Sequence, residues 1–170
     1  AQLFARLGTR VTVIEALGRL APGEEPEISA AIEAVFADEH IAVLTAATVE
    51  KVLAGGGHKL VSVRTRAGVS ELRAEHVLVA TGRRPNTAGL GLEAVGVGVD
   101  GRGAVIVDDR QRTDNARIWA AGDVAGGPQF VYVAAAQGTL VADNAFADAD
   151  RVLDYATVPR LTFTSPAIAA

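Results

Sequence analysis

The chain has 170 residues, of which 49% are hydrophobic and 21% charged, a composition typical of globular proteins rather than disordered ones. Its formal net charge is -4 and it has no run of Lys or Arg, so we expect no nucleic-acid partner. No apolar stretch approaches the roughly 20 residues of a membrane span, so we expect no membrane partner. Because Cys is absent and the His residues are isolated, we expect no disulfide and no metal site.

The first residues predict the back half of a helix that stops at Gly8, and since no Met precedes them we expect the chain to be a fragment. Val11-Thr-Val-Ile-Glu15 is then a β-branched strand that ends in an acid. In dinucleotide-binding βαβ units an acid in this place bonds the adenosine ribose, which makes Glu15 a candidate cofactor contact. A merely solvated Glu is the alternative, because the usual glycine-rich phosphate loop would lie before Ala1.

Pro22 to Ser29 predicts a turn and the start of an amphipathic helix, with Pro26 at its first position and apolar residues at helical spacing as far as Phe36. Ile41 to Leu44 then reads as a strand and completes a strand, helix, strand unit. The hydrophobic period next changes to two, and two Gly-bearing turns divide the pattern, which predicts an antiparallel meander of three strands. Its segments are 48–53, 59–65 and 69–73.

The apolar run from His76 to Ala80 predicts a strand buried on both faces of a parallel sheet. In the following Thr81-Gly-Arg-Arg-Pro-Asn86, Gly82 permits close approach of a ligand. The Arg pair there is either functional or part of a solvated turn. Gly96 to Gly101 matches G-x-G-x-x-G but precedes a strand instead of a helix, so we reject it as a phosphate site.

The stretch from Thr113 to Gly138 predicts a strand at Ile118 to Ala121, a glycine-rich loop and an Ala-rich helix. Asp123 follows the strand, where open α/β sheets bind ligands, so it is a second candidate cofactor contact. The alternative is that Asp123 caps the turn or the next helix. After this helix we expect a linker at Asp148 to Arg151 and a strand-rich element from Val158.

Three motifs, in this order, resemble those of the pyridine nucleotide-disulfide oxidoreductases, flavoenzymes that bind two dinucleotides. They are Val11-Thr-Val-Ile-Glu15 with Pro22-Gly-Glu-Glu-Pro-Glu-Ile-Ser29, Val79-Ala-Thr-Gly-Arg-Arg-Pro-Asn86, and Ile118-Trp-Ala-Ala-Gly-Asp123. The resemblance covers essentially the whole chain. It implies an α/β structure, namely part of a Rossmann-like two-dinucleotide-binding flavoprotein fold, together with the three-stranded antiparallel meander.

The resemblance also implies domain boundaries. Residues 1–82 would belong to the NAD(P)-binding domain, without its first strand and Gly-rich loop. Residues 83–150 would return to the FAD-binding domain, and residues 158–170 would start a truncated dimerisation domain. Because neither dinucleotide-binding domain is whole, we expect exposed apolar edges.

The first cofactor implied by the resemblance is FAD. Asp123 would accept hydrogen bonds from hydroxyls of the FAD ribityl chain. The start of the following helix, around Phe130 and Val131, would point backbone N–H groups at the flavin ring, where the positive end of a helix dipole is suited to an electron-accepting group.

The second cofactor is NADH or NADPH. Glu15 would hold the adenosine ribose, Val49 would flank the adenine, and Gly82 would let the dinucleotide lie close to the chain. Because the Glu15 carboxylate would repel the 2′-phosphate of NADPH, we predict a preference for NADH, although Arg19 is placed to compensate.

Within the family, residues 128–138 and 161–166 are most similar to mercuric reductases, which pass electrons from NAD(P)H through FAD and a cysteine pair to Hg(II), giving Hg(0). Those cysteines are absent here, so we expect no catalytic residue and an inactive fragment. Tyr132 either lines the metal path or is a buried tyrosine. Dihydrolipoyl dehydrogenase is an alternative, favoured by Glu15, and so is a non-catalytic dinucleotide-binding module. The complete protein would be a cytoplasmic homodimer that acts on a small-molecule or metal-ion substrate.

Overall fold

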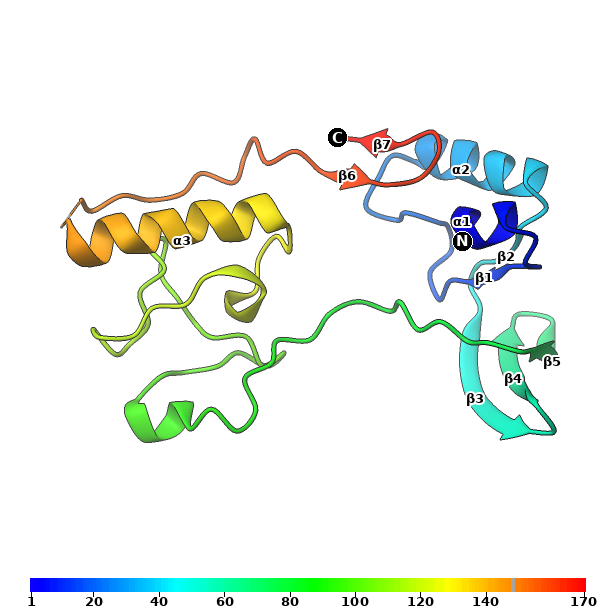
Figure 1. Ribbon diagram of the computed structural model, residues 1–170, viewed down its shortest axis with the longest axis horizontal. Helices are drawn as coiled ribbons and strands as arrows, with labels where there is room; N and C mark the ends of the chain where they lie inside the picture. The colour runs from blue at the N-terminus through cyan, green and yellow to red at the C-terminus, as the bar shows by residue number, and fades with distance from the viewer. Residues whose placement is uncertain (148) are drawn as a thin grey trace. The chain divides into compact units, whose positions relative to one another are not determined.

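The computed structural model of the protein describes residues 1–147 and 149–170, and these form two compact units (Figure 1). The first unit contains Ala1–Val79 and Pro159–Ala170, and the second contains Ala80–Val158. The chain therefore leaves the first unit once and returns to it near its end. Asp148, with which the predicted linker begins, lies outside the described residues.

The first unit starts with the predicted strand, helix, strand arrangement. A short helix, α1 (Gln2–Arg6), ends before Gly8, whose φ of +90° is a conformation that glycine adopts without strain. β1 (Thr12–Ile14) pairs in parallel with β2 (Ala42–Leu44). α2 (Pro26–Asp38) connects these strands and has Pro26 in its first turn, where the missing N–H of proline costs nothing.

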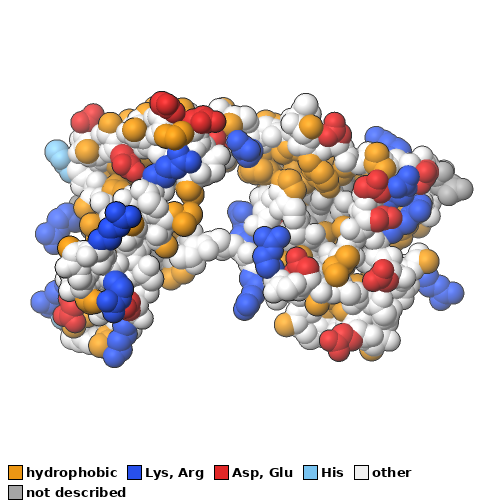
Figure 2. Space-filling view, turned by 180° about the vertical axis from the view of Figure 1, so that it is seen from behind, with side chains coloured by type: hydrophobic (Ala, Val, Ile, Leu, Met, Phe, Trp, Pro, Cys, Tyr) orange, Lys and Arg blue, Asp and Glu red, His pale blue; other side chains and the backbone are white. Residues whose placement is uncertain are grey.

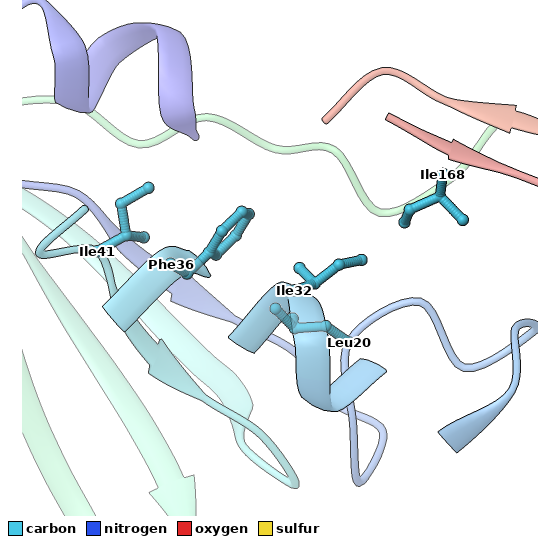
Figure 3. Packing of buried hydrophobic residues seen from close by; sticks show 5 residues of the cluster. All are labelled: Leu20, Ile32, Phe36, Ile41 and Ile168. Atoms are coloured by element: carbon cyan, nitrogen blue, oxygen red, sulfur yellow. The ribbon is translucent and has the colours of Figure 1, made fainter. Parts of the chain in front are cut away.

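One buried cluster packs α2 within this unit. Ile32 and Phe36 lie four residues apart, on the same face of the helix. Figure 3 shows the cluster that they form with residues from three other segments, Leu20, Ile41 and Ile168. Ile168 belongs to β7 (Ile168–Ala169), which pairs antiparallel with β6 (Leu161–Thr162), so the end of the chain contributes to the core of the first unit.

A side-chain amide also joins the two ends of the chain. Nε2 of the buried Gln2 donates to the backbone oxygen of Ser165 at 2.8 Å, and Oε1 accepts from the backbone N–H of Ser165 at 2.8 Å. Nε2 of Gln2 also donates to Oε1 of Glu39 at 2.9 Å. The hydrogen bonds and the apolar cluster together explain why residues 159–170 pack with the first unit.

The three-stranded antiparallel meander predicted from the sequence is confirmed. Its strands lie in the order β3 (Thr48–Gly55), β4 (His58–Thr65) and β5 (Gly68–Ala74). Val61 and Val63 alternate with polar residues on β4 and are buried on one face of the sheet, where Ala47 joins their cluster. Each strand is one or two residues longer than predicted, because the hydrogen-bonded ladder continues up to the turns.

The second unit has one long helix and much irregular chain. α3 (Val131–Phe146) is the predicted Ala-rich helix, and two 3₁₀ helices, η1 (Leu92–Val95) and η2 (Gly122–Ala125), precede it. A small core of Val97, Val105 and Ala120 lies beneath these turns. None of the described helices in either unit is long and apolar enough to cross a membrane.

Three predicted strands are wrong. After Gly101, Val105 forms only an isolated bridge with Val99 in place of the expected strand. His76–Ala80 is irregular, with Leu78 76% and Val79 75% exposed, and among the described residues no strand pairs with it. A buried parallel strand depends on neighbours along both edges, which this segment does not have here. In place of a strand at Ile118–Ala121, Trp119 forms a single antiparallel bridge with Arg112.

The surface carries charges of both signs. On the face shown in Figure 2, Lys and Arg side chains are interspersed with Asp and Glu side chains over both units. Several exposed pairs are in contact, among them Arg64 with Glu50 on the meander at 2.5 Å. Exposed pairs of this kind contribute little to stability.

The meander allows a direct test of its buried face. Val63 on β4 is 0% exposed, so Val63→Ala removes two buried methyl groups, and we expect it to lower the free energy of unfolding by about 2 to 3 kcal/mol. Val69→Ala is the matched control on β5, where Val69 is 53% exposed, and should cost under about 1 kcal/mol. Urea denaturation of the complete protein gives both values, and equal losses would contradict the burial of Val63.

Candidate functional site

The candidate residues divide between the two units. Glu15 and Val49 lie in the first unit, whereas Gly82, Asp123, Phe130 and Val131 lie in the second. Each group is built by its own local geometry.

Asp123 lies in a turn that has a tightly packed glycine before it and another after it, each with a positive φ. Gly122 has a φ of +80°, and a Cβ there would lie 3.3 Å from the Cβ of Ala134 on α3. Gly126 has a φ of +71°, and a Cβ there would lie 3.2 Å from the Cβ of Ala104. The η2 turn therefore lies tightly between α3 and the segment around residue 104, and the position of Asp123 is fixed by backbone packing.

The Asp123 carboxylate is accessible and, among the described residues, has one weak ionic partner. Its side chain is 48% exposed, and Oδ2 lies 3.8 Å from Nε of Arg83. Among the described residues, neither η2 nor α3 has a side-chain cap hydrogen bond, so the alternative in which Asp123 caps a helix is wrong. Both carboxylate oxygens of Asp123 are thus able to accept hydrogen bonds from a ligand.

Arg83 belongs to the Arg pair that the sequence analysis singled out. Its guanidinium donates to the backbone oxygen of Gln129 at 3.4 Å, and its Nε lies 3.8 Å from Oδ2 of Asp123. Arg83 therefore joins the acid of η2 to the segment that leads into α3. No contact of this kind involves Arg84, which is exposed, in the part of the chain that the structure describes.

The start of α3 is open to a ligand. Phe130 is the residue before the first helical turn, with extended φ and ψ of -121° and 144°, and Val131 is exposed at the first helical position. The rings of Phe130 and Tyr132 stack with their centroids 5.2 Å apart and their planes 8° apart. Tyr132 is 42% exposed, so the prediction that it is a buried tyrosine is wrong.

The turn at Asp100 supports this region from the other side. Oδ1 of Asp100 accepts from the backbone N–H groups of Arg102 and Ala104, each at 2.8 Å. These backbone hydrogen bonds, chiefly the one from Ala104, lower the pKa of Asp100 below its ordinary value because they stabilise the charged carboxylate. The next residue, Val105, donates from its N–H to the oxygen of Val124 at 2.9 Å, so the ordered turn holds η2 directly.

Glu15 lies where the sequence predicted it, at the end of the first strand. Its backbone N–H donates to the oxygen of Leu44 at 2.8 Å, which extends the parallel pairing of β1 and β2 by one bond. Oε1 of the half-buried side chain accepts from the N–H of Leu17 at 2.7 Å. Among the described residues Oε2 has no hydrogen bond, so the bond to Oε1 alone orients the carboxylate.

The remaining predicted contacts have simple local settings. The N–H of Ala47 donates to the backbone oxygen of Glu15 at 3.0 Å, which brings the start of β3 and hence Val49 near the acid. Val49 is exposed, like the rest of β3. Arg19 donates to the backbone oxygen of Pro22 at 2.8 Å, which holds its guanidinium in its own loop. In the second unit, Gly82 is exposed and has a φ of +107°.

Gln137 was not among the residues predicted from the sequence. This residue of α3 is 3% exposed, and its Oε1 accepts from the N–H of Gly122, next to Asp123, at 2.6 Å. The available signal was an amide three residues before Leu140 on the buried face of an Ala-rich helix. Buried polar groups need partners, so a Gln at such a position indicates a hydrogen bond to a neighbouring segment.

Known proteins resemble the chain over its full length. Residues 1–138 match the family described as pyridine nucleotide-disulphide oxidoreductase. Mercuric reductase of Streptomyces lividans is 57% identical over 170 residues, which are 100% of this chain and 36% of that protein. Dihydrolipoyl dehydrogenase of Mycobacterium leprae is 41% identical over 165 residues, 96% of this chain and 35% of that protein.

A solved structure agrees with these sequence matches. The HOCl-induced flavoprotein disulfide reductase RclA of Escherichia coli, in its Cu(II) complex, is 32% identical and superposes with a TM-score of 0.89. The match covers 99% of this chain and 38% of RclA, so the chain spans little more than a third of the length of its relatives. The α/β fold is part of the Rossmann-like two-dinucleotide-binding flavoprotein fold, with its antiparallel meander. The chain belongs to the pyridine nucleotide-disulphide oxidoreductase family.

Proposed function

We propose that the complete protein is an FAD-dependent mercuric reductase. NAD(P)H would give up a hydride, and its two electrons would pass through FAD and a cysteine pair to Hg(II), giving NAD(P)⁺, a proton and Hg(0). The observation that carries this proposal is the 57% identity of all 170 residues to a mercuric reductase. The redox cysteines are not among these residues, so this chain contributes cofactor binding.

In this proposal Asp123 accepts hydrogen bonds from hydroxyls of the FAD ribityl chain. Its exposed carboxylate and weak contact with Arg83 support that role. The N–H groups at the start of α3, around Phe130 and Val131, would face the flavin ring, a role supported for Val131 by the absence of a side-chain cap on α3 among the described residues. The N–H of Phe130 donates to the oxygen of Pro128 at 3.1 Å in this structure, so it would have to exchange that partner for the flavin. FAD, when bound, supplies the two-electron chemistry, and the positive end of α3 favours negative charge beside it.

The nicotinamide dinucleotide is held by the other acid. Glu15 accepts from the adenosine ribose hydroxyls, Val49 flanks the adenine, and Gly82 allows close approach of the dinucleotide. The bond from Leu17 to Oε1 supports the assignment of Glu15, because it orients the carboxylate and leaves Oε2 to bind. Because the Glu15 carboxylate would repel the 2′-phosphate of NADPH, we expect a preference for NADH. The Arg19 guanidinium donates to the oxygen of Pro22 in its own loop.

We further propose residues 1–82 as the NAD(P)-binding part, 83–150 as part of the FAD-binding domain and 158–170 as the start of the dimerisation domain. The first boundary lies close to the division of the compact units between Val79 and Ala80. In this proposal the complete protein is a cytoplasmic homodimer.

Dihydrolipoyl dehydrogenase is the second candidate function. It is favoured by the 41% identity to the Mycobacterium leprae enzyme and by the acid at residue 15, which suits NADH. Both enzymes would use Asp123 and Glu15 in the same way, so the substrate distinguishes them.

The complete protein should oxidise NAD(P)H in a manner that depends on Hg(II) and releases Hg(0). The decrease in absorbance of the nicotinamide at saturating Hg(II) and the volatile mercury measure this activity. Lipoamide is the control substrate, and its turnover without any Hg(II)-dependent oxidation would exclude mercuric reductase in favour of the second candidate.

Asp123→Asn keeps the shape of the side chain but removes its charge, so we expect the dissociation constant of FAD to rise about tenfold through loss of charge-assisted hydrogen bonds. Titration of the apoprotein with FAD, followed by flavin fluorescence, measures this constant. Asp114→Asn is the matched control, at an exposed acid of the same unit. An unchanged constant for Asp123→Asn would remove Asp123 from the FAD site.

The complete protein should have a higher kcat/KM with NADH than with NADPH. Glu15→Gln removes the charge that repels a 2′-phosphate and should bring the two values closer by about tenfold. Glu27→Gln, at an exposed acid of α2, is the control and should leave the ratio unchanged. A clear preference of the unmodified protein for NADPH would overturn the assigned role of Glu15.

A further inference from the structure

Gln137 connects the middle of α3 to the turn that carries Asp123. Its Oε1 accepts from the N–H of Gly122 at 2.6 Å, and the side chain is 3% exposed. The N–H of Gly122 belongs to the peptide between Ala121 and Gly122, one residue before Asp123, so this bond fixes the peptide plane from which the chain enters η2. A buried hydrogen bond of this length holds a peptide plane that solvent would otherwise leave free to turn.

Packing against the same face of α3 reinforces this bond. Ala134 lies three residues before Gln137, so the two side chains project from one face of the helix. The backbone of Gly122 approaches Ala134 so closely that an added Cβ would be 3.3 Å from the Ala134 methyl group. The turn therefore touches α3 at two points, one apolar and one polar.

Tyr155 sets the orientation of the Gln137 amide. Nε2 of Gln137 donates to the Tyr155 hydroxyl oxygen at 2.8 Å, which leaves Oε1 facing Gly122. The same hydroxyl oxygen accepts from Nε2 of Gln111 at 3.3 Å. The backbone oxygen of Gln111 in turn accepts from the N–H of Ala120 at 3.2 Å. The residues on both sides of Ala121 are thus bound to one network centred on Tyr155.

A purely structural amide on the same helix provides a comparison. Asn144 is buried, and its side chain accepts from the N–H of Arg151 at 2.7 Å and donates to the Arg151 oxygen at 2.8 Å. These bonds tie the end of α3 to the chain that follows it and do not involve η2. Gln137 and Asn144 therefore have similar burial and similar bonding, but Gln137 alone of the two binds the turn that carries Asp123.

We propose that Gln137 is a positioning residue for the flavin site: held by Tyr155, it fixes the Gly122 peptide so that the Asp123 carboxylate faces the ribityl hydroxyls of FAD. This inference rests on the proposed role of Asp123. Gln137 itself does not contact the cofactor.

The first test compares two amide substitutions in the complete protein. Gln137→Met keeps the length of the side chain and removes the acceptor for Gly122, whereas Asn144→Leu removes the matched structural bonds. We expect Gln137→Met to raise the dissociation constant of FAD about tenfold, the scale of one lost hydrogen bond, and to change the visible circular dichroism of the bound flavin. Asn144→Leu should lower the melting temperature of the apoprotein but leave both flavin measurements unchanged.

A milder substitution covers the case in which Gln137→Met does not fold. Tyr155→Phe removes one hydroxyl oxygen from a partly exposed ring, and it should raise the dissociation constant in the same direction by a smaller factor. Suppose that Asp123→Asn weakens FAD binding but Gln137→Met binds FAD with unchanged affinity and dichroism. The positioning role is then overturned, while the FAD site stands. If Gln137→Met is unfolded, Tyr155→Phe takes its place in this comparison. If Asp123→Asn also binds unchanged, the proposed FAD contact fails, and the inference fails with it.

Discussion

A methyl group at residue 122 would meet the Ala134 side chain at 3.3 Å, and the φ of +80° at that residue excludes most side chains for a second reason. Because residue 122 is a glycine, it meets both constraints, and η2 is able to lie directly on α3. Two consequences follow, since the N–H of Gly122 reaches Gln137 and Asp123 is presented beside the start of α3. The geometry of the second unit's candidate site thus depends on the absence of one side chain.

The two units solve a similar problem in different ways. In the first, a carboxylate at the end of β1 is oriented by a local bond from Leu17. In the second, the carboxylate of Asp123 has no such local bond among the described residues, and its backbone is fixed instead by glycine packing and a distant amide. The orientation of Glu15 needs only neighbouring residues. The position of Asp123, in contrast, needs α3 to be packed against η2.

This difference explains what could be predicted from the sequence. Glu15, α2 and the meander follow from short-range patterns, namely a β-branched run, a helical period of apolar residues and alternation between glycine turns. The location of Asp123 followed from its place after an apolar run. The strand at His76–Ala80 was wrong because a parallel strand depends on partners that a local pattern cannot supply. Gln137 was missed for a related reason: a Gln on an apolar helix face indicates that some partner exists, but no local pattern specifies that the partner is the N–H of Gly122 in η2.

The contribution of Ile168 to the first unit's core has a consequence for synthesis of the protein. Leu20, Ile32, Phe36 and Ile41 all precede the second unit in the chain, whereas Ile168 follows it. On the ribosome, the whole of residues 80–158 must emerge before the fifth member of this cluster and the Ser165 partner of Gln2 are available. The first unit therefore completes its core only after the second unit has been synthesised. Until then, the apolar face of α2 lacks its contact with Ile168.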